Sequence, residues 1–240
     1  MSELTKEQIE WLNKCQGSVY SGKWKFNEET GLVDVDGDFS TPNSYISCKA
    51  LGPQGGLQSR GITDFMGIKF GTVTGNFDCS YNKLENLDGA PMYVGGDFNC
   101  TFNNLKSLEG APRRVMGDFN CSYNKLPNLE GSPMYVGGDF NCTDLYDQYY
   151  LESLQGAEEC IIHGNFESHY NKLEDIKGAP RLIYGQFIVV GSTYGSYKRI
   201  KKDTFLLITR TMEEKNLDYF DALFLLKDSL NKKELNRLVS

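Results

Sequence analysis

The stretch GGDFNCTFNNLKSLEGAP, residues 95–112, recurs along the chain with few changes. Its other copies are GNFDCSYNKLENLDGAP (75–91), GDFNCSYNKLPNLEGSP (117–133) and GNFESHYNKLEDIKGAP (164–180). The glycines that open these units lie 21 residues apart, except for a longer step of 26 residues from Gly138 to Gly164. A fixed period of this length is typical of a solenoid, in which each repeat forms one coil that packs against its neighbours.

The repeat reads G-[DN]-F-x-C-[ST]-[YF]-N-x-L-x-x-L-x-G-[AS]-P-x-x-V. Phe98 and Cys100 alternate, so they are expected to point to the same side of a short strand. Asn103 suits the turn that follows, because its amide can bond backbone groups freed by the bend. Two leucines and Gly-Ala-Pro then carry the chain round without a long helix, and Val115 returns it to the core. Each coil is therefore predicted to stack Phe, Cys, Asn and Leu on its neighbours.

The segment F-x-C-x-x-N-x-L is similar to the leucine-rich-repeat signature L-x-L-x-x-N-x-L, with Phe and Cys replacing two leucines. The following L-x-x-L-x-G-A-P-x-x-V resembles the short bacterial type of that repeat. Together with VDVDGDFS (33–40) and KFGTVTGNFDCS (69–80), the pattern over roughly residues 33–190 resembles leucine-rich-repeat-like proteins encoded by tailed bacteriophages. This resemblance implies a phage accessory protein that acts in the cytoplasm of the host bacterium.

These patterns predict a mainly β fold with C-terminal α structure, built as a leucine-rich-repeat-like solenoid of about five to six coils. Residues 1–74 are expected to form a cap made of a helix, a hairpin and an irregular first coil. The helix would begin at the capping box Thr5-x-x-Gln8. Residues 75–190 form the predicted solenoid, and residues 191–240 a helical cap whose periodicity changes from about Asp203.

Composition excludes several classes of function. The chain has 240 residues and a formal net charge of −7, which argues against nucleic acid as a partner. A polar N-terminus and the lack of a long apolar run predict a cytoplasmic protein that does not enter a membrane. No nucleophile–base pair can be recognised from the spacing of residues in the sequence. The sequence therefore predicts a protein that is not an enzyme and has no cofactor.

The cysteines are interpreted as core residues. They recur in the same position of four coils, at Cys79, Cys100, Cys121 and Cys142, and a small buried thiol packs as an apolar group. Ser168 replaces the cysteine in the next coil, so the position does not preserve a metal ligand. Cys160, His163 and His169 have metal-binding chemistry, but their spacing defines no fourth ligand, and no metal site is predicted.

Strand residues that alternate with Phe and Cys are expected to face outward, on the concave side, as three polar columns. The columns are Asn76, Asp97, Asp118, Asp139 and Asn165; then Asp78, Asn99, Asn120, Asn141 and Glu167; then Ser80, Thr101, Ser122, Thr143 and His169. Tyr81, Phe102, Tyr123 and Tyr170 are expected to flank them. The hypothesis is a docking face for a protein, since solenoids use their concave side in this way. The alternative is that repetition alone produced the columns.

The insertion DLYDQYY, residues 144–150, interrupts the array. Insertions in repeats tend to lie on one face, often the binding face. Tyr146, Tyr149 and Tyr150 are therefore predicted to form a hot spot for the partner.

We therefore expect a non-enzymatic protein-binding solenoid that binds and modulates or inhibits a host protein, such as a defence protein. One alternative is a virion or assembly component that forms homo-oligomers. Another is a protein that sequesters a nucleotide signal, for which Arg113, Arg114 and Arg181 offer a limited basis.

Overall fold

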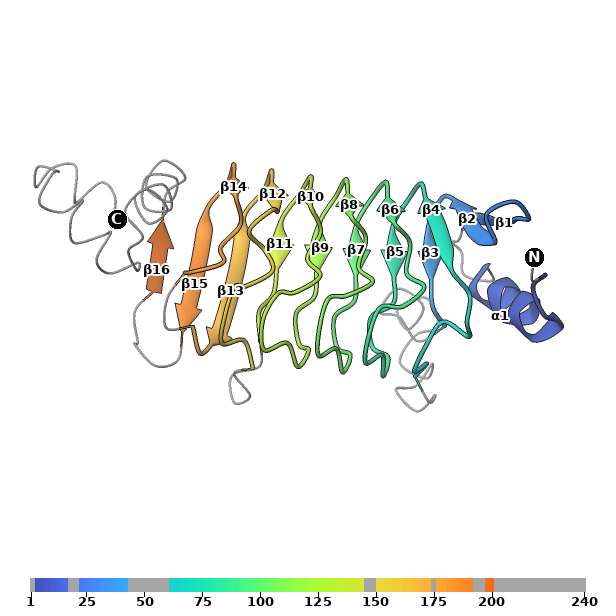
Figure 1. Ribbon diagram of the computed structural model, residues 1–240, viewed down its shortest axis with the longest axis horizontal. Coiled ribbons are helices and arrows are strands. Elements are labelled where there is room, and N and C mark those ends of the chain that lie inside the picture. Colours follow the sequence, from blue (N-terminus) through green and yellow to red (C-terminus); the bar gives the residue numbers. More distant parts are fainter. Residues whose placement is uncertain are drawn as a thin grey trace, which may run out of the picture.

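The computed structural model describes residues 3–16, 22–42, 61–144, 150–173, 176–191 and 197–200. The described chain is mainly β and winds as a solenoid, with a single short helix at its N-terminal end (Figure 1). Its strands form two sheets that run the length of the stack. The coils follow one another in a nearly straight row in the view of Figure 1.

Each coil contributes one short strand to each sheet. The first sheet contains β1 (Lys23–Asn27), β2 (Leu32–Asp36), β4 (Phe70–Val73), β6 (Tyr93–Val94), β8 (Arg114–Val115), β10 (Tyr135–Val136), β12 (Ile161–Ile162) and β14 (Leu182–Ile183). The second contains β3 (Phe39–Ser40), β5 (Phe77–Asp78), β7 (Phe98–Asn99), β9 (Phe119–Asn120), β11 (Phe140–Asn141), β13 (Phe166–Asn171), β15 (Phe187–Gly191) and β16 (Tyr197–Ile200).

Neighbouring coils pair in parallel and in register, so equivalent repeat positions lie side by side. Phe98 is aligned with Phe119, and Val94 with Val115. Only the outermost described pairs, β1 with β2 and β15 with β16, are antiparallel. The strand of the second sheet agrees with the predicted Phe strand. The first sheet was not expected, because the segment before Val was predicted only to return the chain to the core.

The N-terminal helix and hairpin are confirmed. Helix α1 (Lys6–Gln16) begins at the predicted capping box: the Thr5 N–H donates to Gln8 Oε1 at 2.8 Å, and the Gln8 N–H donates to Thr5 Oγ1 at 3.2 Å. The hairpin is β1–β2. The predicted C-terminal helices lie outside the described residues, as does most of the irregular segment before Gly61.

The estimate of five to six coils was too low. The described residues contain seven successive strand pairs, from β2 and β3 to β14 and β15. The additional pair is the first one. Its Gly37-Asp38-Phe39 sequence already follows the repeat, and β3 pairs with β5 in the same parallel arrangement as later coils.

The core consists of identical side chains stacked along the solenoid axis. The rings of Phe77, Phe98 and Phe119 are stacked with centroids 5.5 and 5.4 Å apart and nearly parallel planes. The cysteine, valine and leucine positions of these coils are also buried. This dense apolar interior confirms the predicted packing role of the repeated Phe, Cys and Leu.

A second set of buried side chains, the asparagine ladder, is polar. It comprises Asn82, Asn103 and Asn124. Asn124 Nδ2 donates to the Cys100 and Cys121 carbonyls, both at 3.0 Å, and its Oδ1 accepts the Leu105 N–H at 3.0 Å. One amide thus bonds backbone groups of two consecutive coils, which the two-residue strands alone leave unpaired.

We expect Asn124→Ala to lower the free energy of unfolding by about 3 kcal/mol, because it leaves buried carbonyls and an N–H without partners. The measurement is urea denaturation followed by circular dichroism. Asn104 is the matched control, since its side chain makes no hydrogen bond within the described part of the chain. Asn104→Ala should cost less than about 0.5 kcal/mol. Equal losses in both variants would contradict a special role for the asparagine ladder.

Candidate functional site

The first predicted polar column is part of the structural framework. Asp97 Oδ1 accepts the Asp118 N–H at 2.8 Å, and Asp118 Oδ1 accepts the Asp139 N–H at 2.8 Å. The same bond joins Asp38 to Asn76 at one end and Asn165 to Gln186 at the other. This column, here called the corner ladder, follows the turn between the two sheets and ties each coil to the next.

The corner ladder explains why a glycine precedes the Asp or Asn in each repeat. A Cβ atom on Gly117 would lie 2.1 Å from Asp97 Oδ1 and 2.8 Å from the Gly96 carbonyl carbon. Gly138 has the same relation to Asp118, with a distance of 2.0 Å. The G-[DN] pair of the repeat is therefore one structural device: the glycine leaves space for the side chain of the preceding coil.

The expectation that the other two columns face outward is wrong at several positions. Asp78 is only 2% exposed and Ser80 0% exposed, and Thr101 and Ser122 are also buried. The polar groups bond one another: Asn99 Oδ1 accepts the backbone N–H of Thr101 at 3.1 Å and its hydroxyl at 2.8 Å. The Asp78–Ser80 and Asn99–Thr101 bonds lie within one coil, and the Ser122 hydroxyl donates to Asn141 Oδ1 of the next coil at 2.7 Å.

Several predicted residues of the second sheet remain partly exposed. They are Asn99, Asn120, Asn141, Glu167 and His169. Asn141 Nδ2 donates to Glu167 Oε2 at 3.4 Å, which links the coils on either side of the insertion. The second sheet thus presents a narrow polar strip in which much of the hydrogen-bonding capacity is already used.

The flanking aromatic residues are stacked and half-buried. Ring centroids are 4.5 Å apart for Tyr81 and Phe102, and 4.3 Å for Phe102 and Tyr123. All three residues have left-handed backbone conformations, with φ between 53° and 59°. The next coil has Asp144 at this position, so the insertion interrupts the aromatic row, and Tyr170, with φ 54°, occupies the position again one coil later.

The predicted hot spot in the insertion is only partly within the described residues. Tyr146 and Tyr149 lie outside them, and their role stays a prediction. Tyr150 is half-buried, and its N–H donates to Asp144 Oδ2. This bond joins the first and last residues of the insertion, on the part of the coil that follows β11.

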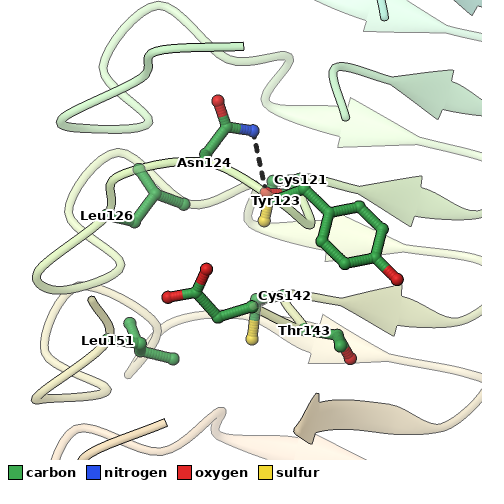
Figure 2. A pocket seen from close by; sticks show the side chains of 8 residues that line it. Cys121, Tyr123, Asn124, Leu126, Cys142, Thr143 and Leu151 are labelled. Atoms are coloured by element: carbon green, nitrogen blue, oxygen red, sulfur yellow. Dashed lines mark hydrogen bonds between the residues drawn. The ribbon is translucent and has the colours of Figure 1, made fainter. Parts of the chain in front are cut away.

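A small hollow lies where the asparagine ladder ends. Its lining includes Cys121, Asn124, Leu126, Cys142 and Leu151, and Figure 2 shows Asn124 donating to the Cys121 carbonyl beside it. The hollow admits about one water molecule. It is therefore too small to hold a nucleotide, and it gives the nucleotide-sequestering alternative no support.

The six described cysteines are free and buried, which confirms their interpretation as core residues. Burial raises the pKa of the Cys15, Cys142 and Cys160 thiols to about 12. Burial also raises the pKa of Cys79, Cys100 and Cys121 well above the usual value. These thiols stay protonated at neutral pH and are poor nucleophiles.

The described residues contain no group of three His, Cys, Asp or Glu side chains that could hold a metal ion. Cys160 is buried, His163 is exposed beside β12 of the first sheet, and His169 lies in β13 of the second. The structure therefore does not bring these three residues together.

The outward side of the first sheet is a surface that sequence analysis missed. The name first-sheet face is used here for the part along β6 to β14, which consists of Met92, Tyr93, Arg113, Arg114, Met116, Met134, Tyr135, Ile161, His163, Arg181, Leu182 and Tyr184. Met92 is 56% exposed, Met134 48% and Tyr184 46%. The sequence feature that indicates this surface is the P-x-x-V segment. Its two variable positions hold Met-Tyr or Arg-Arg in otherwise regular repeats.

Part of the first-sheet face is a continuous column of side chains, here called the stacked column, in which the His163 and Tyr184 rings are stacked and the Tyr135 and His163 rings are tilted by 50°. The Arg114 guanidinium lies 4.8 Å from the centroid of the Tyr135 ring. The Tyr135 and His163 centroids are 5.2 Å apart, and those of His163 and Tyr184 are 4.5 Å apart. Cation–π and aromatic contacts of this kind fix the orientation of exposed side chains.

Comparison of the chain with protein-family models, curated proteins and solved structures found no match. Within the described part of the chain, no helix combines the length and apolar character needed to span a membrane.

The corner ladder predicts a difference between two substitutions of Asp118. Asp118→Ala removes the acceptor of the Asp139 N–H and should lower the free energy of unfolding by about 1 kcal/mol. Asp118→Asn should stay within about 0.5 kcal/mol of the parent, because Asn76 and Asn165 accept the same bond in other coils. Thermal and urea denaturation provide the comparison. A loss in Asp118→Asn as large as in Asp118→Ala would show that the negative charge matters, contrary to this account.

The buried cysteines predict low thiol reactivity. In the folded protein at pH 8, at most one of the seven cysteines should react rapidly with Ellman's reagent, because six are buried and hold raised pKa values. All seven should react after unfolding in guanidinium. Rapid reaction of several thiols in the native protein would contradict their burial.

Proposed function

We propose that this chain is a non-enzymatic, leucine-rich-repeat-like protein-binding solenoid and that the first-sheet face is its main contact surface. The observation that carries the proposal is the exposure of large apolar side chains on one sheet across neighbouring coils, including Met92, Met116 and Met134. Contiguous exposed apolar groups on a soluble protein commonly mark an interaction site.

The composition of this face supports the proposal. Tyr, Met and Arg are enriched at protein interfaces, and Tyr and Arg are frequent among the residues that dominate binding energy. These side chains are not needed to complete the core, because the Phe, Cys, Leu and Val positions already fill it. The second sheet is a weaker candidate, since its polar groups bond one another.

The biological setting of the proposal rests on the sequence resemblance. We place the chain among phage accessory proteins that act in the host cytoplasm, where its partner would be a host protein that it modulates or inhibits. The insertion at 144–150 is the competing contact site. Its first and last residues, Asp144 and Tyr150, follow β11 of the second sheet and thus lie away from the first-sheet face.

The test is an affinity pull-down from bacterial lysate, with bound proteins identified by mass spectrometry. The face variant carries Met116→Ser and Met134→Ser. Its matched control carries Ile9→Ser and Met66→Ser, which replace two apolar residues of similar exposure near α1. A third variant changes Tyr146, Tyr149 and Tyr150 to Ala. Each variant is first checked for its thermal unfolding midpoint.

We expect a specific partner to be retained by the parent, the control and the insertion variant, and to be lost by the face variant. Loss in the insertion variant alone would move the contact to residues 144–150. Capture of the chain itself, with concentration-dependent size in solution, would favour the self-associating structural alternative. Absence of any captured protein would contradict the proposal.

A further inference from the structure

We propose that the stacked column on the first-sheet face binds an acidic segment of the partner protein. This inference rests on the proposed function and specifies the chemistry of the partner at that surface. The column runs from Arg114 through Tyr135 and His163 to Tyr184, over four successive coils.

The first argument is the balance of donors and acceptors. The polar groups of the column are a guanidinium, an imidazole and two phenols, all of which can donate hydrogen bonds. None of the named residues along β6 to β14 is acidic, and the acidic residues on the outward side of this sheet, Asp34 and Asp36, lie on β2 toward the N-terminal end. Arg113 and Arg181 add two further cations beside the column. Carboxylates are the protein groups that such a surface recognises best, through charge-assisted hydrogen bonds.

The second argument is that this basic surface contrasts with the rest of the molecule. The chain has a formal net charge of −7. The exposed Asp97 and Asp118 of the corner ladder border the face on one side, while Arg113 lies at the other end of β8, the strand that Asp118 follows. An acidic segment is therefore attracted to the arginine side and repelled from the corner, which gives it a preferred position.

The third argument distinguishes a polypeptide from a nucleic acid. Tyr135 has Arg114 on one side and His163 on the other, and His163 lies between Tyr135 and Tyr184. The Arg114 guanidinium lies over the Tyr135 ring, and the His163 ring is stacked on that of Tyr184, so these two contacts occupy ring faces on which bases would otherwise stack.

The column is also supported by its neighbours. Arg113 Nη2 lies 3.2 Å from Met134 Sδ, and Met134 and Met116 remain largely exposed. Flexible thioether side chains adapt to varied apolar groups, while the stacked column is ordered before binding. The face therefore suits a segment in which acidic and apolar residues are mixed.

The experiment measures fluorescence anisotropy with a fluorescein-labelled peptide rich in Glu and Leu. Two further probes are the same peptide with Gln in place of Glu, and an oligothymidylate of similar length. The test variant is Arg113→Glu with Arg114→Glu. Its matched control is Lys83→Glu with Lys125→Glu, which makes the same change of charge at exposed positions on another side of the coil.

We expect the parent and the lysine control to bind the Glu peptide. The affinity of the arginine variant for this peptide should be lower by a factor of about ten or more. Binding of the Gln peptide should also be about tenfold weaker, and added salt should weaken binding of the Glu peptide. Tighter binding of the oligothymidylate than of the Glu peptide, equal losses in both charge variants, or no binding of the Glu peptide would each overturn the inference.

The pull-down separates this inference from the proposed function. If the arginine variant keeps the cellular partner that Met116→Ser with Met134→Ser loses, the face binds a protein but not through acidic groups. If the methionine variant also keeps every partner, the proposed contact surface itself is wrong.

Discussion

The fold depends on hydrogen bonds that run along the solenoid axis from one coil to the next. Most strands have only two residues, so a coil can make few sheet bonds of its own. The buried Asn124 amide and the Asp118 carboxylate add bonds to backbone groups of adjacent coils. These bonds require identical register in successive coils, and identical register in turn stacks Phe on Phe and Cys on Cys. The repeated sequence is the consequence of that geometric requirement.

This constraint limits where function can reside. A position that serves the stacking, such as Gly117, Asn103 or Cys100, is not free to vary with a partner. The acidic column resembles a binding surface in sequence, but one oxygen of each side chain is occupied by the next coil in the corner ladder. The two positions before each Val in the P-x-x-V segment are not required for the stacking of coils. They are where the coils differ and where Met, Tyr and Arg are exposed.

The insertion shows where the repeated sequence can change without loss of the stacking. In the coil that begins at Gly138, the aromatic row and the asparagine ladder are both interrupted and the insertion takes their place, while Tyr170 and the buried Asn171 occupy these positions again in the next coil. Asp144 accepts the Tyr150 N–H and so joins the two ends of the insertion, while β11 and β13 still pair in register. A solenoid of this kind accepts extra residues at one turn because each sheet is held by contacts on both sides of every coil.

The sequence by itself determined the period, the core positions and the N-terminal helix and hairpin, because each of these is encoded locally or repeated many times. The sequence Gly37-Asp38-Phe39 also matches the start of a repeat and so indicates an additional coil, although the predicted hairpin includes these residues. Only the tertiary structure decided which polar residues are exposed and able to contact a partner. Whether Asp78 is exposed, or Asp97 bonded to the next coil, depends on contacts between residues far apart in the chain. The first-sheet face has the same cause: alternation predicts that Tyr135 and Val136 face opposite ways, but only the stacking of coils brings Arg114, Tyr135 and His163 together on one face.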